Sequence, residues 1–294
     1  MDIFNLSMQA VLGQLLLGLV NGSFYAMLSL GLAVIFGLLR VVNFAHGAVF
    51  MMGSMLAWIG LTQLDLSYWI MIIVAPLLTG LVGIAIEKGL LKRLYGLDPL
   101  YGLLLTFGVT LLLEGFFRSF YGVSGMSYNV PDSLQGAVDL GFMILPYYRG
   151  WVVLASLTVC FGTWFLIEKT KIGALLRAGT ENPKLVQAFG VNFPLLVTLT
   201  YGFGVALAAF AGVLASPIIQ ISPLMGSNLI ITIFAIVVIG GMGSIMGSIL
   251  TGLSLGLLEA FVKVIYPEAS STVVFFVMVL VLLLRPAGLF GKET

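Results

Sequence analysis

The chain has 294 residues, of which 60% are hydrophobic and only 9% are charged, and its formal net charge is +1. A soluble domain carries about 25% charged residues, so this composition excludes an ordinary soluble globular protein. Repeated apolar runs of about 20 residues are typical of helices that cross a bilayer. The sequence therefore predicts an all-α, polytopic helical bundle in a membrane, organised as a single transmembrane domain over residues 1–294.

Nine apolar segments follow one another along the chain and predict eight or nine spans, some of them broken. They lie near 10–39, 44–64, 69–86, 98–117, 151–168, 194–215, 228–240, 247–264 and 272–284. The first segment is long for one span, and Asn21, Gly22 and Ser23 are candidates for a break within it. The seventh and ninth segments are short for a bilayer crossing.

The basic residues predict which loops face the cytoplasm. If the loop at 169–193 is cytoplasmic, ten basic residues fall inside and three outside, as the positive-inside rule requires. The inside set is Arg40, Lys88, Lys92, Arg93, Lys169, Lys171, Arg177, Lys184, Arg285 and Lys292, and the outside set is Arg118, Arg149 and Lys263. The C-terminus is then cytoplasmic. The N-terminus lies outside if the first segment spans once, and inside if it folds back.

Two connections are long. Residues 118–150 form an external loop, which is either a contact surface for an external partner or a connector.

The cytoplasmic loop at 169–193 predicts two short amphipathic helices with a sharp bend between them. In the first, apolar residues recur at helical spacing before Arg177: Ile172, Leu175 and Leu176. In the second, Asn182 is a typical N-cap, and Pro183 suits the first turn, where its missing N–H costs nothing.

The second short helix has an apolar face and a defined end. Leu185 and Phe189 are four residues apart and so share one face. Gly190 then suits a left-handed helix stop. Such a helix can dock into a groove on a partner and transmit movement, whereas the alternative is a helix that rests on the lipid surface. The bent construction favours docking.

The stretch RVVNFAHGAVFMMG, residues 40–53, contains the single histidine of the chain. On a helix, Asn43, His46 and Gly47 would share one face. Two interpretations remain open. The polar pair lines the transport path, or His46 hydrogen-bonds a neighbouring helix and holds a broken segment in shape. No ligands or relay partners accompany His46 for a metal or proton role.

Glycines cluster in GGMGSIMG, residues 240–247, between two apolar runs. Glycine disfavours a continuous helix, so a turn or an unwound segment is expected there. Non-helical backbone at membrane depth is tolerated where it lines a cavity or is buried in protein, but small residues also permit a tight helix crossing. Both interpretations are open. The glycines that we place on the pathway are Gly47, Gly53, Gly240, Gly241 and Gly243.

Carboxylates inside apolar segments are functional candidates by default. Glu114 follows Thr106 and Thr110 at four-residue spacing, so the three share one helix face, and we include Glu114 among the pathway residues. Glu259 lies late in another span. Both glutamates lie towards the outer ends of their spans, where a solvated structural role costs little.

Catalytic motifs are missing from the sequence. There is no GxxxxGK[ST] phosphate loop, so this chain is not expected to hydrolyse ATP. One histidine and one cysteine cannot form the usual zinc sites, and Cys160 alone excludes a disulfide within the chain. We therefore expect a transport subunit with no catalytic residue, no metal and no cofactor of its own.

Four motifs, in order, resemble the permease subunits of bacterial branched-chain amino acid ABC importers, within that family the LivH type. They are NFAHG at 43–47, the loop at 177–192, GGMGS at 240–244 and LRPAGLFG at 284–291. The resemblance covers essentially the whole chain. It implies a second permease subunit, identical or different, in the bacterial inner membrane. It also implies two cytoplasmic ATPases that use ATP, and a periplasmic binding protein that delivers an amino acid.

The resemblance further implies that the loop at 171–192 is the coupling loop that docks on an ATPase. The residues concerned are Leu175, Arg177, Glu181, Asn182, Pro183, Leu185, Phe189 and Gly190. The loop departs from the general importer pattern, because Glu181 is followed by Asn182 and Pro183 rather than by two alanines. The expected cargo is a branched-chain or other hydrophobic amino acid.

Two alternative functions are a urea or short-amide ABC permease and a stand-alone channel or secondary transporter. A stand-alone channel or secondary transporter would need an ion or proton relay within the membrane, and ionisable residues deep in the apolar segments are scarce.

Overall fold

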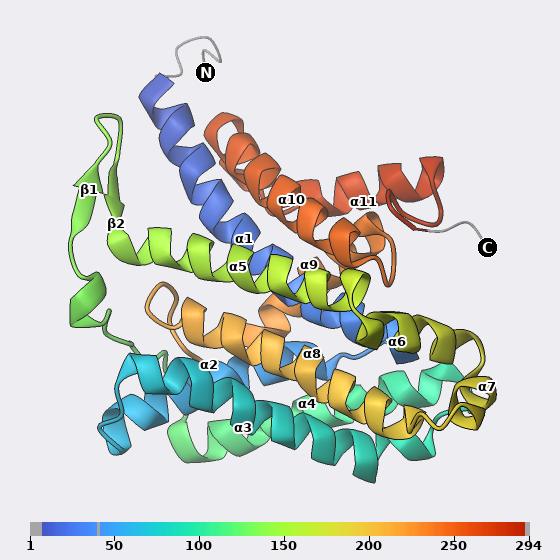
Figure 1. The fold of residues 1–294 in the computed structure, drawn as a ribbon. Coiled ribbons are helices and arrows are strands. Elements are labelled where there is room, and N and C mark those ends of the chain that lie inside the picture. The colour runs from blue at the N-terminus through green and yellow to red at the C-terminus, as the bar shows by residue number, and fades with distance from the viewer. Residues whose placement is uncertain (1–7, 40–41, 292–294) are drawn as a thin grey trace. The chain divides into compact units, whose positions relative to one another are not determined.

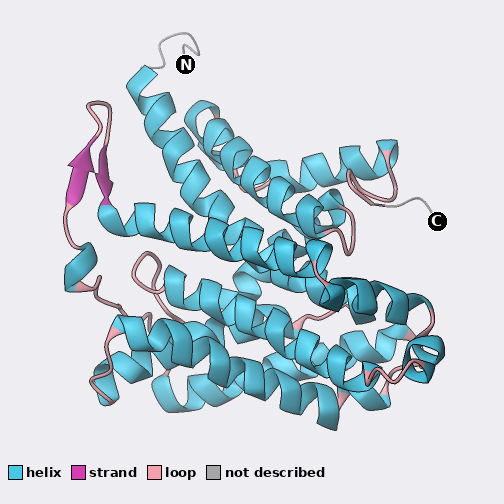
Figure 2. Ribbon diagram, viewed as in Figure 1, coloured by secondary structure: helices cyan, strands magenta, loops and turns pink. Residues whose placement is uncertain are grey.

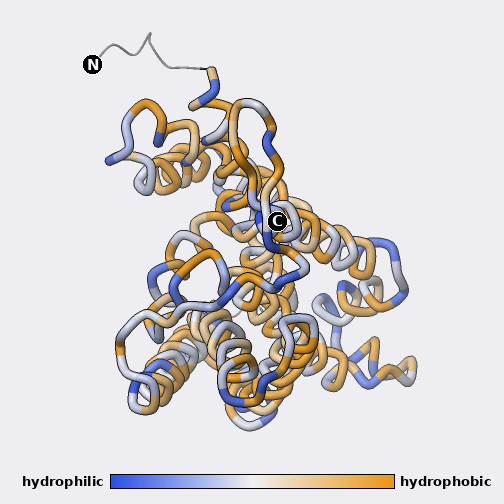
Figure 3. Tube along the Cα trace, turned by 90° about the vertical axis from the view of Figure 1, so that its left-hand side faces the viewer, coloured by the Kyte–Doolittle hydropathy of each residue, from blue (hydrophilic) through white to orange (hydrophobic). Residues whose placement is uncertain are grey.

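The computed structural model describes residues 8–39 and 42–291. Arg40 and Lys292, two of the basic residues that predict the orientation, lie outside the described residues. Figure 2 shows that the described chain is mostly helical, with one β-hairpin. The chain trace in Figure 3 is hydrophobic along most of its helices, as the composition predicts.

The helices follow the predicted apolar segments in order (Figure 1). They are α1 (Met8–Leu39), α2 (Ala45–Gln63), α3 (Tyr68–Gly89), α4 (Pro99–Tyr121), α5 (Tyr147–Lys169), α6 (Lys171–Glu181), α7 (Pro183–Ala188), α8 (Phe193–Ala215), α9 (Met225–Gly240), α10 (Ile245–Ile265) and α11 (Val273–Leu284). Short 3-10 turns occupy Leu91–Arg93, Asp132–Leu134 and Pro267–Ala269. In the predicted external loop, β1 (Ala137–Asp139) pairs antiparallel with β2 (Ile144–Pro146).

Within residues 8–39 and 42–291, seven helices are long and apolar enough to cross a membrane: α1, α2, α3, α4, α5, α8 and α10. Two shorter apolar helices, α9 and α11, fall on the seventh and ninth predicted segments. The 12 residues of α11 extend about 18 Å, less than the roughly 30 Å hydrocarbon core of a bilayer. The predicted all-α polytopic membrane fold is confirmed.

The described residues form two compact units, one from 8–29, 130–160 and 232–291, the other from 30–39, 42–129 and 161–231. In the first unit, small residues of α1 and α10 bring the two helices into backbone contact. They recur every four residues on both: Gly18, Gly22 and Ala26 on α1, and Gly252, Gly256 and Ala260 on α10. This spacing creates the flat surface that lets membrane helices approach closely.

The break considered at Asn21, Gly22 and Ser23 is absent, because α1 is a continuous helix of 32 residues. Gly22 serves the crossing instead, since a Cβ there would lie 3.0 Å from Leu253 Cα. The Ser23 hydroxyl donates to the Val20 carbonyl of its own helix at 2.8 Å. Sequence alone does not separate a glycine that breaks a helix from one that faces a partner helix.

We expect Gly256→Ala to destabilise the protein, although alanine is the better helix former by about 0.5–1 kcal/mol. A Cβ at Gly256 would lie 2.7 Å from the Gly18 carbonyl oxygen and would push α1 and α10 apart. Overpacking of this kind costs about 1–3 kcal/mol. Thermal unfolding in detergent measures the effect. Gly115→Ala on α4 is the matched control, because its Cβ meets nothing within 4 Å. Equal melting temperatures for the two variants would contradict the crossing.

In the second unit, α8 packs against both α2 and α3. Its buried residues include most of its length, with Tyr201, Val205 and Ala209 among them. The Ser54 hydroxyl of α2 donates to the Gly212 carbonyl of α8 at 2.7 Å, which fixes the register of the two helices. The centre of this unit is therefore α8, the helix that directly follows the loop at 169–193.

Candidate coupling segment and pathway sites

The predicted pair of short helices is present in residues 171–192, which we call the coupling segment. It consists of α6 and α7, separated by Asn182. Asn182 Oδ1 accepts a hydrogen bond from the Leu185 N–H at 3.0 Å, and Pro183 occupies the first turn of α7. Gly190 has φ +82°, as its predicted role of helix stop requires. Local sequence therefore specifies both the bend and the end of the segment.

One end of the coupling segment is fastened to α5. Arg177 Nη1 donates to the Ile167 carbonyl at 2.8 Å and lies 3.4 Å from Glu168 Oε2. Gly173 passes so close to Ile167 that a Cβ there would overlap the backbone. The exposed ion pair contributes little stability, about 0–1 kcal/mol. Arg177 therefore has a role within the chain, which is to hold α6 against the end of α5.

The other end of the coupling segment packs on α8. Val186 of α7 is buried against Phe193 and Val197, the first turns of α8. Gly179 leaves room for the Phe193 ring, since a Cβ there would lie 2.7 Å from ring atom Cζ. The buried contact therefore joins α7 to the start of α8.

The packing of Val186 leaves an apolar face of the coupling segment uncovered. Phe189 is 80% exposed and Leu185 is 54% exposed. Glu181 is also exposed, whereas Leu175 is partly buried. Because α6 and α7 lie outside the candidate membrane spans, the exposure of these apolar side chains does not follow from membrane crossing alone.

Asn43 does not lie on a helix face, contrary to the prediction, because α2 begins only at Ala45. Its amide joins two elements instead. Oδ1 accepts from the Ala45 N–H at 3.1 Å, and Nδ2 donates to the Tyr201 hydroxyl of α8 at 3.2 Å. Thr106 of α4 accepts from the Phe44 N–H at 3.1 Å. Side chains thus supply hydrogen-bond partners for backbone groups in and next to the short non-helical stretch at 42–44.

His46 is fully buried, with 0% of its surface exposed. Its backbone N–H donates to the Asn43 carbonyl at 3.3 Å. The imidazole lies beside Gly31 of α1, where a Cβ would come within 3.0 Å of Cε1. His46 thus belongs to the packed interior of the second unit and lines neither of the two clefts described below.

The helical break expected around 43–53 does not extend past Phe44, because α2 is continuous from Ala45. Gly47 and Gly53 permit close helix approach within it. A Cβ at Gly47 would lie 2.6 Å from the Gly226 carbonyl oxygen, and one at Gly53 would lie 2.5 Å from Ala209 Cα. Tertiary contacts therefore explain these glycines without any unwinding of the helix.

The glycine cluster at 240–247 forms a turn and also a tight crossing. The helix α9 ends at Gly240, and α10 begins at Ile245. Gly241 and Gly243 have φ of +96° and +86°, values that favour glycine. Beyond the turn, a Cβ at Gly240 would lie 2.7 Å from the Gly247 carbonyl carbon. Both interpretations of the cluster therefore apply.

The C-terminal motif LRPAGLFG covers the end of α9. The N–H groups of Leu289 and Phe290 donate to the carbonyls of Ile239 and Gly240 at 2.8 and 3.2 Å. Helix ends leave such carbonyls without partners inside the helix, and burying them unpaired is costly. The non-helical backbone of the cluster is thus buried in protein, which is one of the two ways in which a membrane protein tolerates it.

Three carboxylates within the helices accept hydrogen bonds from hydroxyl groups of other elements. Glu114, which shares the buried face of α4 with Thr106 and Thr110, accepts from Ser227 of α9. Glu259 of α10 accepts from Tyr25 of α1 at 2.8 Å. The third, Glu87, accepts two hydrogen bonds and is only 1% exposed.

Glu87 was missed by the sequence analysis, which ended the third span at residue 86. It stands next to Lys88 at the end of an apolar run, a position typical of an exposed helix end. The structure extends α3 to Gly89 and buries Glu87. The available signal was the helical spacing of Glu87 from the buried positions Thr79, Gly80 and Gly83 of the same helix.

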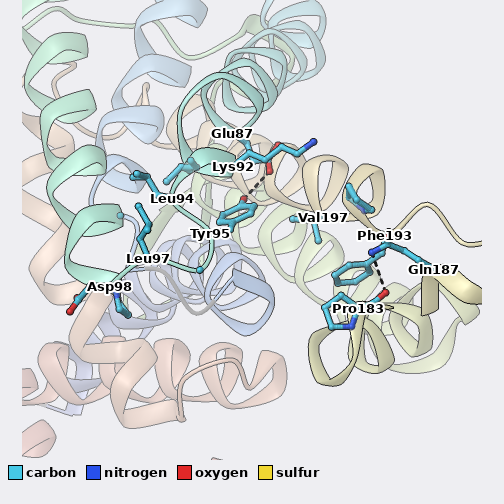
Figure 4. Close-up of a pocket in the computed structure, with 15 residues that line it drawn as sticks. Glu87, Lys92, Leu94, Tyr95, Leu97, Asp98, Pro183, Gln187, Phe193 and Val197 are labelled. Atoms are coloured by element: carbon cyan, nitrogen blue, oxygen red, sulfur yellow. Dashed lines mark hydrogen bonds between the residues drawn. The ribbon is translucent and has the colours of Figure 1, made fainter. Parts of the chain in front are cut away.

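Two clefts of the described residues lie near the segments considered above. The larger, of about 470 Å³, lies in the second unit beside the coupling segment (Figure 4). It is lined by Glu87, Leu91, Lys92, Leu94, Tyr95, Gly96, Leu97, Asp98, Pro99, Gly102, Pro183, Gln187, Phe193, Pro194 and Val197. The smaller, of about 380 Å³, lies in the first unit between α9, α10, α11 and the C-terminal motif and is mainly apolar. Among the residues described, no three His, Cys, Asp or Glu side chains gather as a metal site would need.

Comparison with known proteins agrees with the helical, multi-pass membrane architecture. A family model described as the branched-chain amino acid transport system permease component matches residues 14–282. The high-affinity branched-chain amino acid transport system permease protein BraD of Pseudomonas aeruginosa is 32% identical over 96% of both chains. The corresponding LivH protein of Escherichia coli is 26% identical over 96% of both chains. The galactofuranose transporter permease protein YtfT of Escherichia coli is 34% identical over 42% of this chain and 35% of its own. No solved structure matches the chain.

The apolar helices define a multi-pass membrane protein, and the family match makes it a transport protein. The chain belongs to the branched-chain amino acid transport permease family. It is a permease subunit of an ABC transport system and not an enzyme, and ATP hydrolysis is the work of partner subunits.

Proposed function

We propose that this permease imports branched-chain or other hydrophobic amino acids across the bacterial inner membrane. The observation that carries the proposal is the match over nearly the whole chain to relatives described as branched-chain amino acid permeases. The partial match to a galactofuranose permease covers less than half of the chain. A periplasmic binding protein would deliver the amino acid, and a second permease subunit, identical or different, would complete the path.

The orientation that fits the basic residues places the coupling segment in the cytoplasm. Since α1 is one continuous helix, the N-terminus would then lie outside. If the seven long and the two shorter apolar helices all alternate in direction across the membrane, the C-terminus would lie in the cytoplasm. The hairpin of β1 and β2 would face the periplasm, where the binding protein approaches.

The uncovered face of the coupling segment would dock on a partner ATPase. Closure of the two ATPases on ATP would move α7, and the buried contact of Val186 with Phe193 would pass this movement to α8. Arg177 and Asn182 would support the docking face by fixing α6 and α7. The residues that we assign to coupling are Leu175, Arg177, Glu181, Asn182, Pro183, Leu185, Phe189 and Gly190.

The pathway residues would act in two ways. Gly47, Gly53, Gly240, Gly241 and Gly243 would set the separation of the helices around the path, because each supports a close approach or a turn. Asn43 and His46 would hold the start of α2 in place. Glu114 would offer a polar group near the outer end of its helix, where Ser227 orients its carboxylate.

The substrate class is tested by competition in proteoliposomes that contain the complete transporter and its cognate binding protein. Uptake of radiolabelled leucine should be ATP-dependent and should be inhibited by isoleucine and valine in excess. Urea and acetamide, at the same excess, should leave it unchanged. Inhibition by urea or acetamide, with none by isoleucine or valine, would assign the protein to the short-amide permeases instead.

A further inference from the structure

We propose that Glu87, Tyr95 and Thr198 form a positioning cluster that carries the movement of the coupling segment into α3. This inference rests on the proposed function, because it presumes that the coupling segment is moved by a partner ATPase. Neither the family match nor the names of the relatives assign a role to these residues. We refer to the three residues as the Glu87 cluster.

The Glu87 cluster joins three elements through one buried carboxylate. The Tyr95 hydroxyl, from the connection between α3 and α4, donates to Glu87 Oε1 at 2.8 Å. The Thr198 hydroxyl of α8 donates to Oε2 at 2.7 Å. Both carboxylate oxygens are therefore engaged, each by a different element. Hydrogen bonds to a charged acceptor are shorter and about twice as strong as neutral ones.

The hydroxyl of Tyr95 is well suited to act as a donor. Burial, together with the hydrogen bond to Glu87 and the charge of its carboxylate, raises the pKa of Tyr95 above its ordinary value. The phenol therefore stays protonated at neutral pH. Tyr95 is 37% exposed, so the cluster reaches from the interior to the surface that we place in the cytoplasm.

The neighbouring cleft explains why this cluster is needed. Pro183 and Gln187 of α7 lie across the cleft of about 470 Å³ from the loop that carries Tyr95 (Figure 4). Packing across such a space is weak, because atoms on either side of it lack contact partners. The rigid connection available is through the first turns of α8, where Val197 contacts Val186 and the next residue, Thr198, bonds Glu87.

The polar contacts continue one turn further along α8. Tyr201 follows Thr198 by three residues and accepts the hydrogen bond of Asn43, just before α2. A displacement at the start of α8 therefore reaches α3 through Thr198 and the start of α2 through Tyr201. The Glu87 cluster supplies the α3 branch of this connection.

The test is Thr198→Val in the complete transporter, with uptake and ATP hydrolysis measured in the same proteoliposomes. The variant keeps the β-branched shape but leaves one oxygen of a buried carboxylate unpaired, so we expect uptake per ATP hydrolysed to fall about fivefold or more. Binding of the ATPase and the rate of hydrolysis should change less than about twofold, because the docking face is intact. Thr198→Ser, which restores the hydroxyl, should recover the coupling ratio.

Thr200→Val is the matched control, because the Thr200 hydroxyl bonds the Leu196 carbonyl of its own helix. If Thr198→Val does not fold, Tyr95→Phe tests the same cluster from the more exposed side and should lower the same ratio. A coupling ratio for Thr198→Val or Tyr95→Phe that equals the Thr200→Val value would overturn the inference. Absence of ATP-driven uptake in the unmodified transporter would instead overturn the proposed function.

Discussion

Phe189→Asp should abolish ATP-driven uptake while the permease itself folds and inserts normally. Phe189 is 80% exposed, so the change removes little internal packing. It places a charge on the apolar face that we assign to the ATPase. Loss of a central aromatic contact costs about 2–4 kcal/mol in interfaces of this kind, which weakens binding by about thirtyfold or more. Co-purification of the ATPase and uptake in proteoliposomes measure the two effects.

The control for Phe189→Asp is Leu140→Asp, which also adds a charge at an exposed apolar residue, on the hairpin predicted to be external. It should leave ATPase binding unchanged. If the coupling segment rests on lipid, Phe189→Asp would not weaken ATPase binding, and the docking assignment would be wrong. The same result would remove the main argument for mechanical coupling through α7.

Gly288→Ala should destabilise the first unit more than any other single-methyl change that we consider. Gly288 has φ +83°, and a Cβ there would lie 2.5 Å from Gly241 Cα and 2.6 Å from the Val238 carbonyl oxygen. The left-handed conformation costs an alanine about 1–2 kcal/mol, and the overlap adds about 1–3 kcal/mol. The C-terminal motif would separate from the end of α9, exposing the carbonyls that Leu289 and Phe290 cover.

Gly141→Ala is the control for Gly288→Ala, because it measures the destabilisation that comes from the left-handed backbone conformation alone. Gly141 has φ +80°, but a Cβ there meets nothing within 4 Å. Thermal unfolding in detergent should therefore show a small decrease in the melting temperature for Gly141→Ala and a clearly larger one for Gly288→Ala. Equal decreases would mean that the C-terminal motif does not pack against Gly241 as described.

Local signals predicted the coupling segment well. Asn182, Pro183 and Gly190 act through their own backbone neighbours, so their types and spacing specify a cap, a first turn and a helix stop. The apolar periodicity likewise located the nine apolar helices. Features of this kind depend on residues within one or two turns of each other, and a single sequence contains that information.

Features that depend on distant contacts were not predictable in the same way. Gly22 was a candidate for a break, and Gly53 lay in an expected broken stretch, but both sit in continuous helices and face another helix. Glu87 was passed over because its donors come from 8 and 111 residues away. The residue type alone does not show which role a glycine or a carboxylate has. That role depends on the residues that the folded chain brings next to it.

The central claim is that partner ATPases drive transport through the coupling segment of this permease. The most direct measurement compares amino acid uptake into proteoliposomes that hold the permease pair alone with uptake into those that also hold the two ATPases, with ATP and the loaded binding protein present in both. We predict uptake only with the ATPases, and its loss when Phe189→Asp is introduced. Equal uptake by the permease pair without the ATPases would contradict the account and indicate a stand-alone channel or secondary transporter.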